Sequence, residues 1–164
     1  MDALTTLVLV LNIGTVKIEL LPDVAPKHVS QIKSLVEQKA YDGVVFHRVI
    51  DGFMAQTGDV LHGNYQSLNS ALVGTGGSDL PNITAEFSQV SHQRGVVSMA
   101  RSSHPDSANS QFFICFGDAS FLDGQYSVFG KVTEGMDIID RIKKGHSQSG
   151  SVDNPDYIES AYIE

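Results

Sequence analysis

Short apolar segments separated by turn residues run through most of this 164-residue chain, and this pattern constrains the fold more than any other feature. Val16, Ile18 and Leu20 alternate with charged residues, which is the period of a half-buried strand. Asp-Gly pairs, typical of turns between strands, stand at 42–43, 51–52 and 123–124. The pattern predicts a mainly β fold with strands at residues 4–11, 16–20, 44–49, 53–57, 95–100, 111–116, 126–132 and 157–163.

Two other segments have the spacing of amphipathic helices. The first is predicted to start near Asp23 as its N-cap and to end near residues 41–43, with a buried stripe of Val29, Ile32, Leu35 and Val36. The second is predicted at residues 134–144, with Thr133 as its cap and a buried face of Ile138, Ile139 and Ile142. Many short strands with two separated helices are typical of an antiparallel barrel or a sandwich, and the pattern alone does not distinguish the two.

Charge and composition argue against several classes of protein. The formal charge of −8 and the sequence pI of about 5.1 disfavour a general nucleic-acid binder, which needs a basic surface. The apolar run at residues 7–11 is too short to span a bilayer, and the lack of Lys or Arg before Lys17 disfavours a signal peptide. We therefore expect one domain over residues 1–164, cytoplasmic and monomeric, that binds neither nucleic acid nor a membrane.

The chain lacks the common catalytic and metal-binding motifs. It has no Cys-x-x-Cys, His-Glu-x-x-His or Gly-x-Ser-x-Gly, and its lone Cys115 is interpreted as a buried hydrophobic residue. The histidines have no metal-ligand spacing and are interpreted as surface or hydrogen-bonded side chains: His28, His47, His62, His92, His104 and His146. We expect no metal and no cofactor, while a hydrolase triad assembled from distant Ser, His and Asp residues stays open.

A long segment without periodicity interrupts the strand pattern. Residues 60–73 are rich in Gly, Asn, Ser and Gln and predict a surface loop. The sequence leaves open whether this loop is functional or a tolerated insertion. Residues 74–77, Gly-Thr-Gly-Gly, are interpreted as a flexible turn because no helix follows them to form a phosphate site.

The segment at residues 46–59 is hard to explain as core packing alone; it reads Phe-His-Arg-Val-Ile-Asp-Gly-Phe-Met-Ala-Gln-Thr-Gly-Asp. It closely resembles the most characteristic motif of the cyclophilins, in which Phe-His-Arg-Val-Ile is followed by Gly-Phe-Met-x-Gln and a Gly-Asp pair. Further matches follow in the family's order at residues 95–101, 109–115, 121–124 and 128–132. Together they extend across most of the chain, whose compact length resembles that of bacterial members.

The resemblance implies a closed eight-stranded antiparallel β-barrel capped by two α-helices, with the substrate groove on its outside. It implies a peptidyl-prolyl cis-trans isomerase that assists protein folding and binds proline-containing peptides and unfolded or folded protein clients. Carried over by position, the catalytic residues are Arg48, Phe53 and Gln56. The implied substrate-binding residues are Met54, Ala100, Arg101, Gln111, Phe113, Phe121, Leu122 and Tyr126.

The resemblance also implies a role for each of these residues. Arg48 is the catalytic arginine, and Gln56 and Gln111 orient the substrate or Arg48. The proline pocket is lined by Phe53, Met54, Phe113 and Leu122, the preceding peptide is held by the backbone of Ala100 and Arg101, and the rim is formed by Phe121 and Tyr126. Many members have Trp at the Phe121 position and His at the Tyr126 position. These departures leave the proline pocket intact and predict weaker binding of cyclosporin-type inhibitors.

An arginine suits the chemistry of this reaction. Rotation about a peptide bond before proline meets a barrier of ~18–20 kcal/mol because it breaks amide resonance, and no covalent bond has to break. A permanently charged guanidinium such as that of Arg48 can donate to the amide nitrogen or a neighbouring carbonyl as the bond twists. The alternative is a non-catalytic proline-peptide-binding chaperone or scaffold on the same fold, which the presence of Arg48 disfavours.

Overall fold

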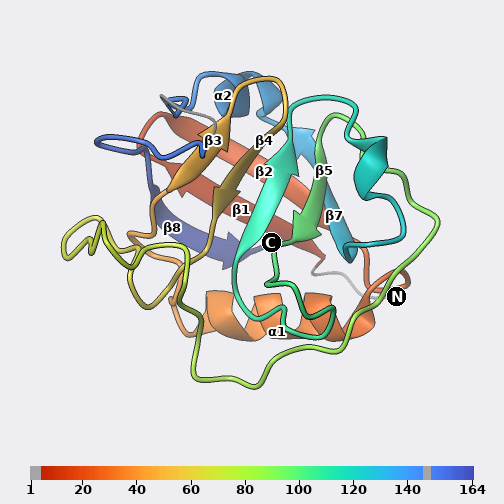
Figure 1. Ribbon diagram of the computed structural model, residues 1–164. Coiled ribbons are helices and arrows are strands. Elements are labelled where there is room, and N and C mark those ends of the chain that lie inside the picture. Colours follow the sequence, from red (N-terminus) through yellow and green to blue (C-terminus); the bar gives the residue numbers. More distant parts are fainter. Residues whose placement is uncertain (1–4, 146–148) are drawn as a thin grey trace.

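The computed structural model describes residues 5–145 and 149–164 and contains one strongly curved antiparallel sheet with a helix at each end (Figure 1). Its strands are β1 Thr6–Leu11, β2 Gly14–Leu20, β3 Arg48–Ile50, β4 Met54–Thr57, β5 Val96–Met99, β6 Phe112–Cys115, β7 Val128–Glu134 and β8 Ile158–Ile163. The helices are α1 Pro26–Glu37 and α2 Met136–Asp140, with a short 3₁₀ helix, η1 Ser120–Leu122. Each predicted strand overlaps an observed one; Leu4, where the first was predicted to start, and His146 lie outside the described residues.

The sheet has the order β3-β4-β6-β5-β7-β2-β1-β8, and its neighbours are antiparallel. The prediction of a closed barrel is wrong. Within the described residues the two edge strands, β3 and β8, do not pair as strands, so the sheet is an open half-barrel. The reason lies in residues 44–49, predicted as one strand. Val45 makes an isolated bridge to Tyr157, and the regular strand begins only at Arg48, too late to continue along β8.

The main core fills the inside of the half-barrel. The predicted alternation of β2 is confirmed, because Val16, Ile18 and Leu20 are buried while Glu19 is exposed. They pack into one cluster with Phe112 and side chains from the other strands. Burying a large apolar side chain contributes roughly 1.5–3 kcal/mol, so this cluster is the main source of stability.

Strand β6 divides its side chains between two faces. Phe112 and Ile114 belong to the main core, whereas Phe113 and Cys115 belong to a second cluster that also contains Met54 of β4. Successive residues of a strand point to opposite faces of the sheet, so this second cluster lies on the outer face of β4 and β6. The outer face thereby gains an apolar floor of its own.

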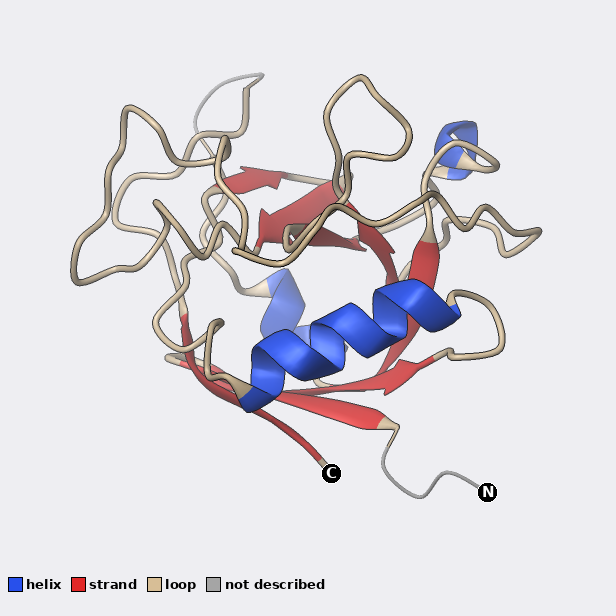
Figure 2. Cartoon of the chain, turned by 90° about the horizontal axis from the view of Figure 1, so that it is seen from below, coloured by secondary structure: helices blue, strands red, loops and turns tan. Residues whose placement is uncertain are grey.

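Helix α1 lies across one open end of the sheet (Figures 1 and 2), and its predicted apolar stripe is buried. The predicted N-cap at Asp23 is wrong, because the cap position is Ala25, which has no side-chain hydrogen bond. The helix is capped instead by Glu86, whose carboxylate accepts the backbone N–H groups of Lys27 (3.1 Å) and His28 (2.8 Å). A cap supplied from a distant loop satisfies the same free donors as a local one and leaves no local pattern in the sequence.

The second helix is shorter than predicted. Strand β7 continues to Glu134, so Thr133 lies in a strand and does not cap a helix. Gly135, with φ of 94°, ends the strand and starts α2, and this backbone conformation favours glycine. Two of the three predicted isoleucines, Ile139 and Ile142, are buried, while Ile138 is half-buried. No helix in the described ranges has the length and apolar character that crossing a bilayer requires.

Candidate active site

A groove of about 380 Å³ lies over the outer apolar face of β4 and β6. Nine of the eleven residues predicted for the site line it: Arg48, Phe53, Met54, Gln56, Ala100, Arg101, Phe113, Leu122 and Tyr126. The other two lie at its borders. Gln111 hydrogen-bonds to Gln56, and Phe121 packs on Phe53. The structure thus brings together residues that stand up to 78 positions apart in the chain.

Arg48 is held by hydrogen bonds at one side of the groove. Its Nη1 donates to Gln56 Oε1 at 3.2 Å, and its Nε donates to the Ser149 carbonyl at 3.0 Å. Gln56 in turn donates from Nε2 to Gln111 Oε1 at 2.9 Å. Arg48 and Gln56 are directly opposite in the β3–β4 register, so strand pairing itself sets the first contact. The guanidinium is therefore fixed beside the groove before any ligand is bound.

The predicted flexible turn at residues 74–77 is tied into this chain of contacts. Gln111 Nε2 donates to the carbonyls of Gly74 (3.0 Å) and Gly76 (2.9 Å). The buried Asp59 carboxylate accepts the backbone N–H groups of the same two glycines, at 2.7 and 3.0 Å. It also accepts two N–H groups at residues 61–62. Although burial opposes it, these four donors hold the pKa of Asp59 below its ordinary value.

The backbone at position 58, the first residue of the Gly-Asp pair, requires a glycine. Its φ is 100°, and a Cβ at this position would lie 2.5 Å from the Ser110 carbonyl oxygen. Ser110 itself donates from Oγ to the Gly58 carbonyl at 2.7 Å. A larger residue would push apart the end of β4 and the start of β6, and would move Asp59 with them.

The apolar part of the groove has a floor and a rim. Met54 and Phe113 form the floor and are 2% and 5% exposed. Tyr126 meets the Phe113 ring edge-on, with centroids 5.8 Å apart. At the rim, Phe121 is 66% exposed and its ring centroid lies 5.5 Å from that of Phe53. Such a surface suits a small apolar ring rather than a charged ligand.

Ala100 and Arg101 lie where the groove leaves the sheet. The Ala100 N–H donates to the Gln111 carbonyl at 3.0 Å, so this predicted substrate-binding group is already engaged within the protein. The Arg101 guanidinium lies over the Tyr126 ring, 4.6 Å from its centroid, and donates to the Gln125 carbonyl. Arg101 thus braces the rim through its side chain, a contact that the sequence did not indicate.

His47 is a groove residue that the sequence reasoning missed. It is 9% exposed, and neither ring nitrogen has a hydrogen-bond partner in the described part of the chain, contrary to its interpretation as a surface or hydrogen-bonded histidine. Burial lowers its pKa to about 4, a shift that Asp59 opposes and Arg48 reinforces. The sequence signal that could have indicated this role was the position of His47 directly before Arg48.

The predicted loop at residues 60–73 also reaches the groove, through Ser70 and Val73.

Other predicted side chains lie away from any reactive arrangement. Cys115 is buried, and burial raises the pKa of its thiol to about 12, as expected for a hydrophobic residue. Across residues 5–145 and 149–164, no three His, Cys, Asp or Glu side chains converge as metal ligands. Asp123, His92 and Ser98 do form a Ser-His-Asp chain of contacts, but Ser98 and His92 are fully buried. A serine that no substrate can reach is not a hydrolase nucleophile.

Comparison with known proteins identifies the family. The model of the family described as cyclophilin type peptidyl-prolyl cis-trans isomerase/CLD matches residues 6–163. The chain belongs to this family. A probable peptidyl-prolyl cis-trans isomerase of Brucella suis biovar 1 is 58% identical over 165 residues, which cover 99% of this chain and 84% of that protein. The peptidyl-prolyl cis-trans isomerase of Acinetobacter baylyi is 38% identical over 136 residues, covering 80% of this chain and 68% of that protein.

Solved cyclophilin structures share the fold. The crystal structure of cyclophilin AquaCyp293 from Hirschia baltica has a TM-score of 0.83 and 29% identity, covering 99% of this chain and 75% of that one. A Cryptosporidium parvum cyclophilin type isomerase, crystallised in the presence of the dipeptide Ala-Pro, has a TM-score of 0.82 and 26% identity, covering 97% and 98%. This cyclophilin is therefore a peptidyl-prolyl cis-trans isomerase with a mainly β fold.

Proposed function

We propose that the groove binds an Xaa-Pro segment of a peptide or protein client and that Arg48 is the catalytic residue. The observation that carries this proposal is the fixed position of the Arg48 guanidinium, hydrogen-bonded to Gln56 and to the Ser149 carbonyl, beside a groove with an apolar floor. The proline ring would lie against Phe113 and Met54. The Cryptosporidium parvum cyclophilin was crystallised in the presence of the dipeptide Ala-Pro, which supports a prolyl ligand for this fold.

The proposed mechanism favours the twisted amide over both planar forms. As the bond rotates, the prolyl nitrogen loses conjugation and gains a lone pair, to which a guanidinium N–H of Arg48 can donate. The Gln56 contact holds the guanidinium in place, so little reorganisation is needed when the charge develops. Phe113 and Met54 exclude water from one side of the site, which strengthens this donor bond. The mechanism needs no nucleophile, metal or cofactor.

A non-catalytic proline-binding chaperone or scaffold would use the apolar groove without Arg48. Exchange NMR on a short Xaa-Pro peptide, with and without catalytic amounts of the protein, separates the two functions. Cross-peaks between cis and trans forms at mixing times of a second or less indicate catalysis, because the uncatalysed step takes tens to hundreds of seconds. Binding without faster exchange would support the scaffold instead.

We also propose that residues 1–164 act as one monomeric cytoplasmic domain. Analytical ultracentrifugation tests the monomeric state, and cell fractionation tests the location.

We expect the isomerase rate to be insensitive to chelators and nearly flat between about pH 6 and pH 8. Arginine stays charged throughout this range. Burial lowers the pKa of His47, the titratable neighbour of Arg48, to about 4, so it stays neutral there. Exchange NMR at three pH values, with and without EDTA, measures both effects. A bell-shaped profile, or activity restored by zinc, would contradict the mechanism.

Cyclosporin should inhibit this cyclophilin more weakly than members with Trp at the Phe121 position. Phe121 is exposed at the rim and offers apolar contact but no hydrogen-bond donor. A neutral hydrogen bond contributes ~0.5–1.5 kcal/mol, so Phe121→Trp should tighten cyclosporin binding roughly two- to tenfold. Calorimetric titration of both proteins measures the change.

Turnover of a small prolyl peptide is the matched control for this substitution. The floor of Met54 and Phe113 is unchanged in Phe121→Trp, so turnover should stay within about twofold. Tyr126→His tests the second departure at the same rim. Equal cyclosporin affinities in wild type and Phe121→Trp would mean that the missing indole donor does not limit binding.

A further inference from the structure

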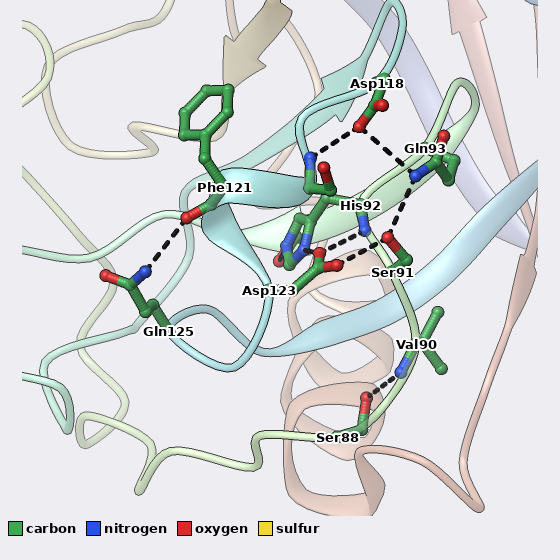
Figure 3. Close-up of polar contacts among 11 residues, drawn as sticks. Ser88, Val90, Ser91, His92, Gln93, Asp118, Phe121, Asp123 and Gln125 are labelled. Atoms are coloured by element: carbon green, nitrogen blue, oxygen red, sulfur yellow. Dashed lines mark hydrogen bonds and ion pairs between the residues drawn. The ribbon is translucent and has the colours of Figure 1, made fainter.

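His92 is a fully buried histidine that lies just before β5 and behind the groove. Its Nδ1 is 3.0 Å from Asp123 Oδ1, and its Nε2 is 2.9 Å from Ser98 Oγ (Figure 3 shows the Asp123 contact). A neutral ring with its proton on Nδ1 satisfies both contacts, donating to Asp123 and accepting from the Ser98 hydroxyl. A buried ring with both nitrogens engaged has one permitted orientation, because any rotation leaves a polar atom without a partner.

Asp123 follows directly after η1 and is bound to the segment that carries His92. Its carboxylate accepts the Ser91 hydroxyl at 2.6 Å and the His92 backbone N–H at 2.7 Å, in addition to the ring (Figure 3). On the other side of η1, the Ala119 N–H donates to the His92 carbonyl at 2.8 Å. Residues 91–92 therefore hold η1 at both of its ends. A 3₁₀ helix of three residues has too few internal hydrogen bonds to fix its own position.

The His92 ring connects this attachment to the groove. It stacks on Phe113 of the floor, with centroids 6.1 Å apart and planes at 17°, and it meets Tyr126 edge-on at 6.4 Å. The η1 helix supplies Leu122, which lines the groove, and Phe121 at the rim. One side chain thus contacts the floor directly and holds the rim through Asp123.

We propose that His92 and Asp123 are positioning residues that set the rim of the prolyl groove relative to its floor and so determine affinity for the proline ring. The proposal rests on the proposed function of the groove. Arg48 is attached separately, through Gln56 and Ser149, and neither contact involves His92 or Asp123. Loosening the rim should therefore weaken substrate binding and leave the conversion of bound substrate almost unchanged.

Asp123→Ala removes three accepted hydrogen bonds and should raise KM roughly three- to tenfold, with kcat within about twofold of wild type. A rim that grips planar and twisted substrate alike affects both forms equally, which is why KM changes and kcat does not. Asp123→Asn should restore KM to within about twofold, because its amide oxygen can still accept from His92 and its amide N–H can donate to Ser91. Exchange NMR over a range of peptide concentrations yields both constants, and thermal unfolding confirms that each variant is folded.

Asp118→Ala is the matched control. Asp118 lies before η1 and accepts the Ser120 N–H at 2.8 Å and Gln93 Nε2 at 3.4 Å, without a contact to His92 in the described chain (Figure 3). Its loss should leave KM within about twofold. The proposal is overturned if Asp118→Ala raises KM as much as Asp123→Ala, or if folded Asp123→Ala keeps the wild-type KM. An inactive wild-type protein would overturn the proposed function as well, whereas an active wild type with an unaltered Asp123→Ala variant overturns the positioning role alone.

Discussion

Replacing Arg48 with alanine should lower the isomerisation rate at saturating peptide by ~10²–10³-fold, the usual cost of losing one preorganised donor at a site of developing charge. The guanidinium is held by two hydrogen bonds beside the apolar floor, so it contributes to the twisted amide without first being ordered. Binding should suffer less, because Met54 and Phe113 remain in place. Exchange NMR on an Xaa-Pro peptide measures the rate, and line broadening on titration measures the affinity.

Arg94→Ala is the matched control for this loss of a guanidinium. Arg94 makes a bidentate pair with Asp140, at 2.9 and 2.7 Å, and is absent from the groove lining, so its removal should leave the rate unchanged. Arg48→Lys keeps the charge but not the planar fork and should be intermediate. A folded Arg48→Ala protein that isomerises at close to the wild-type rate would show that the central catalytic group lies elsewhere.

The strands could be predicted because their cause is local. A half-buried strand such as β2 alternates apolar and charged residues whatever it pairs with. The errors occur where distant residues decide the outcome. Glu86 caps α1 from 58 or more positions away, and pairing of Glu134 with Lys17 of β2 extends β7 through the predicted start of the second helix, so that α2 begins only after Gly135. Closure of the barrel depended on whether two edges meet in register, and no pattern within either segment encodes that.

The sequence predicted most of the residues proposed for the site, but not the contacts that hold them in place. Resemblance supplied nine of the residues that line the groove, and eight of these lie in the matched segments 46–59, 95–101, 109–115 and 121–124. The hydrogen bonds that hold these residues in place join positions far apart in sequence, such as Asp123 with His92 and Asp59 with Gly74. Aspartate and histidine are common on surfaces, so their burial and their partners become visible only once the chain is folded.

His47 should make the protein unstable in acid. Its pKa is about 4 in the folded protein because the ring is buried, against about 6.5 for an exposed histidine in the unfolded chain. As the pH falls below 6.5, the unfolded state therefore binds a proton before the folded state does. The stability that neutral His47 contributes is complete above pH 6.5 and is lost as the pH falls towards 4. The difference corresponds to about 3 kcal/mol of unfolding free energy.

His47→Leu should remove this part of the pH dependence. Urea unfolding at pH 7, 6, 5 and 4 should give a variant whose free energy of unfolding falls by about 3 kcal/mol less than that of wild type. Burial also lowers the pKa of His28, but that group is common to both proteins and cancels in the difference. His104→Leu, which replaces an exposed histidine, is the matched control and should follow the wild-type curve. Parallel curves for wild type and His47→Leu would mean that water or a hydrogen-bond partner reaches the His47 ring. The site beside Arg48 would then be wetter than a dry prolyl groove requires, so the same measurement also tests the water exclusion on which the mechanism depends.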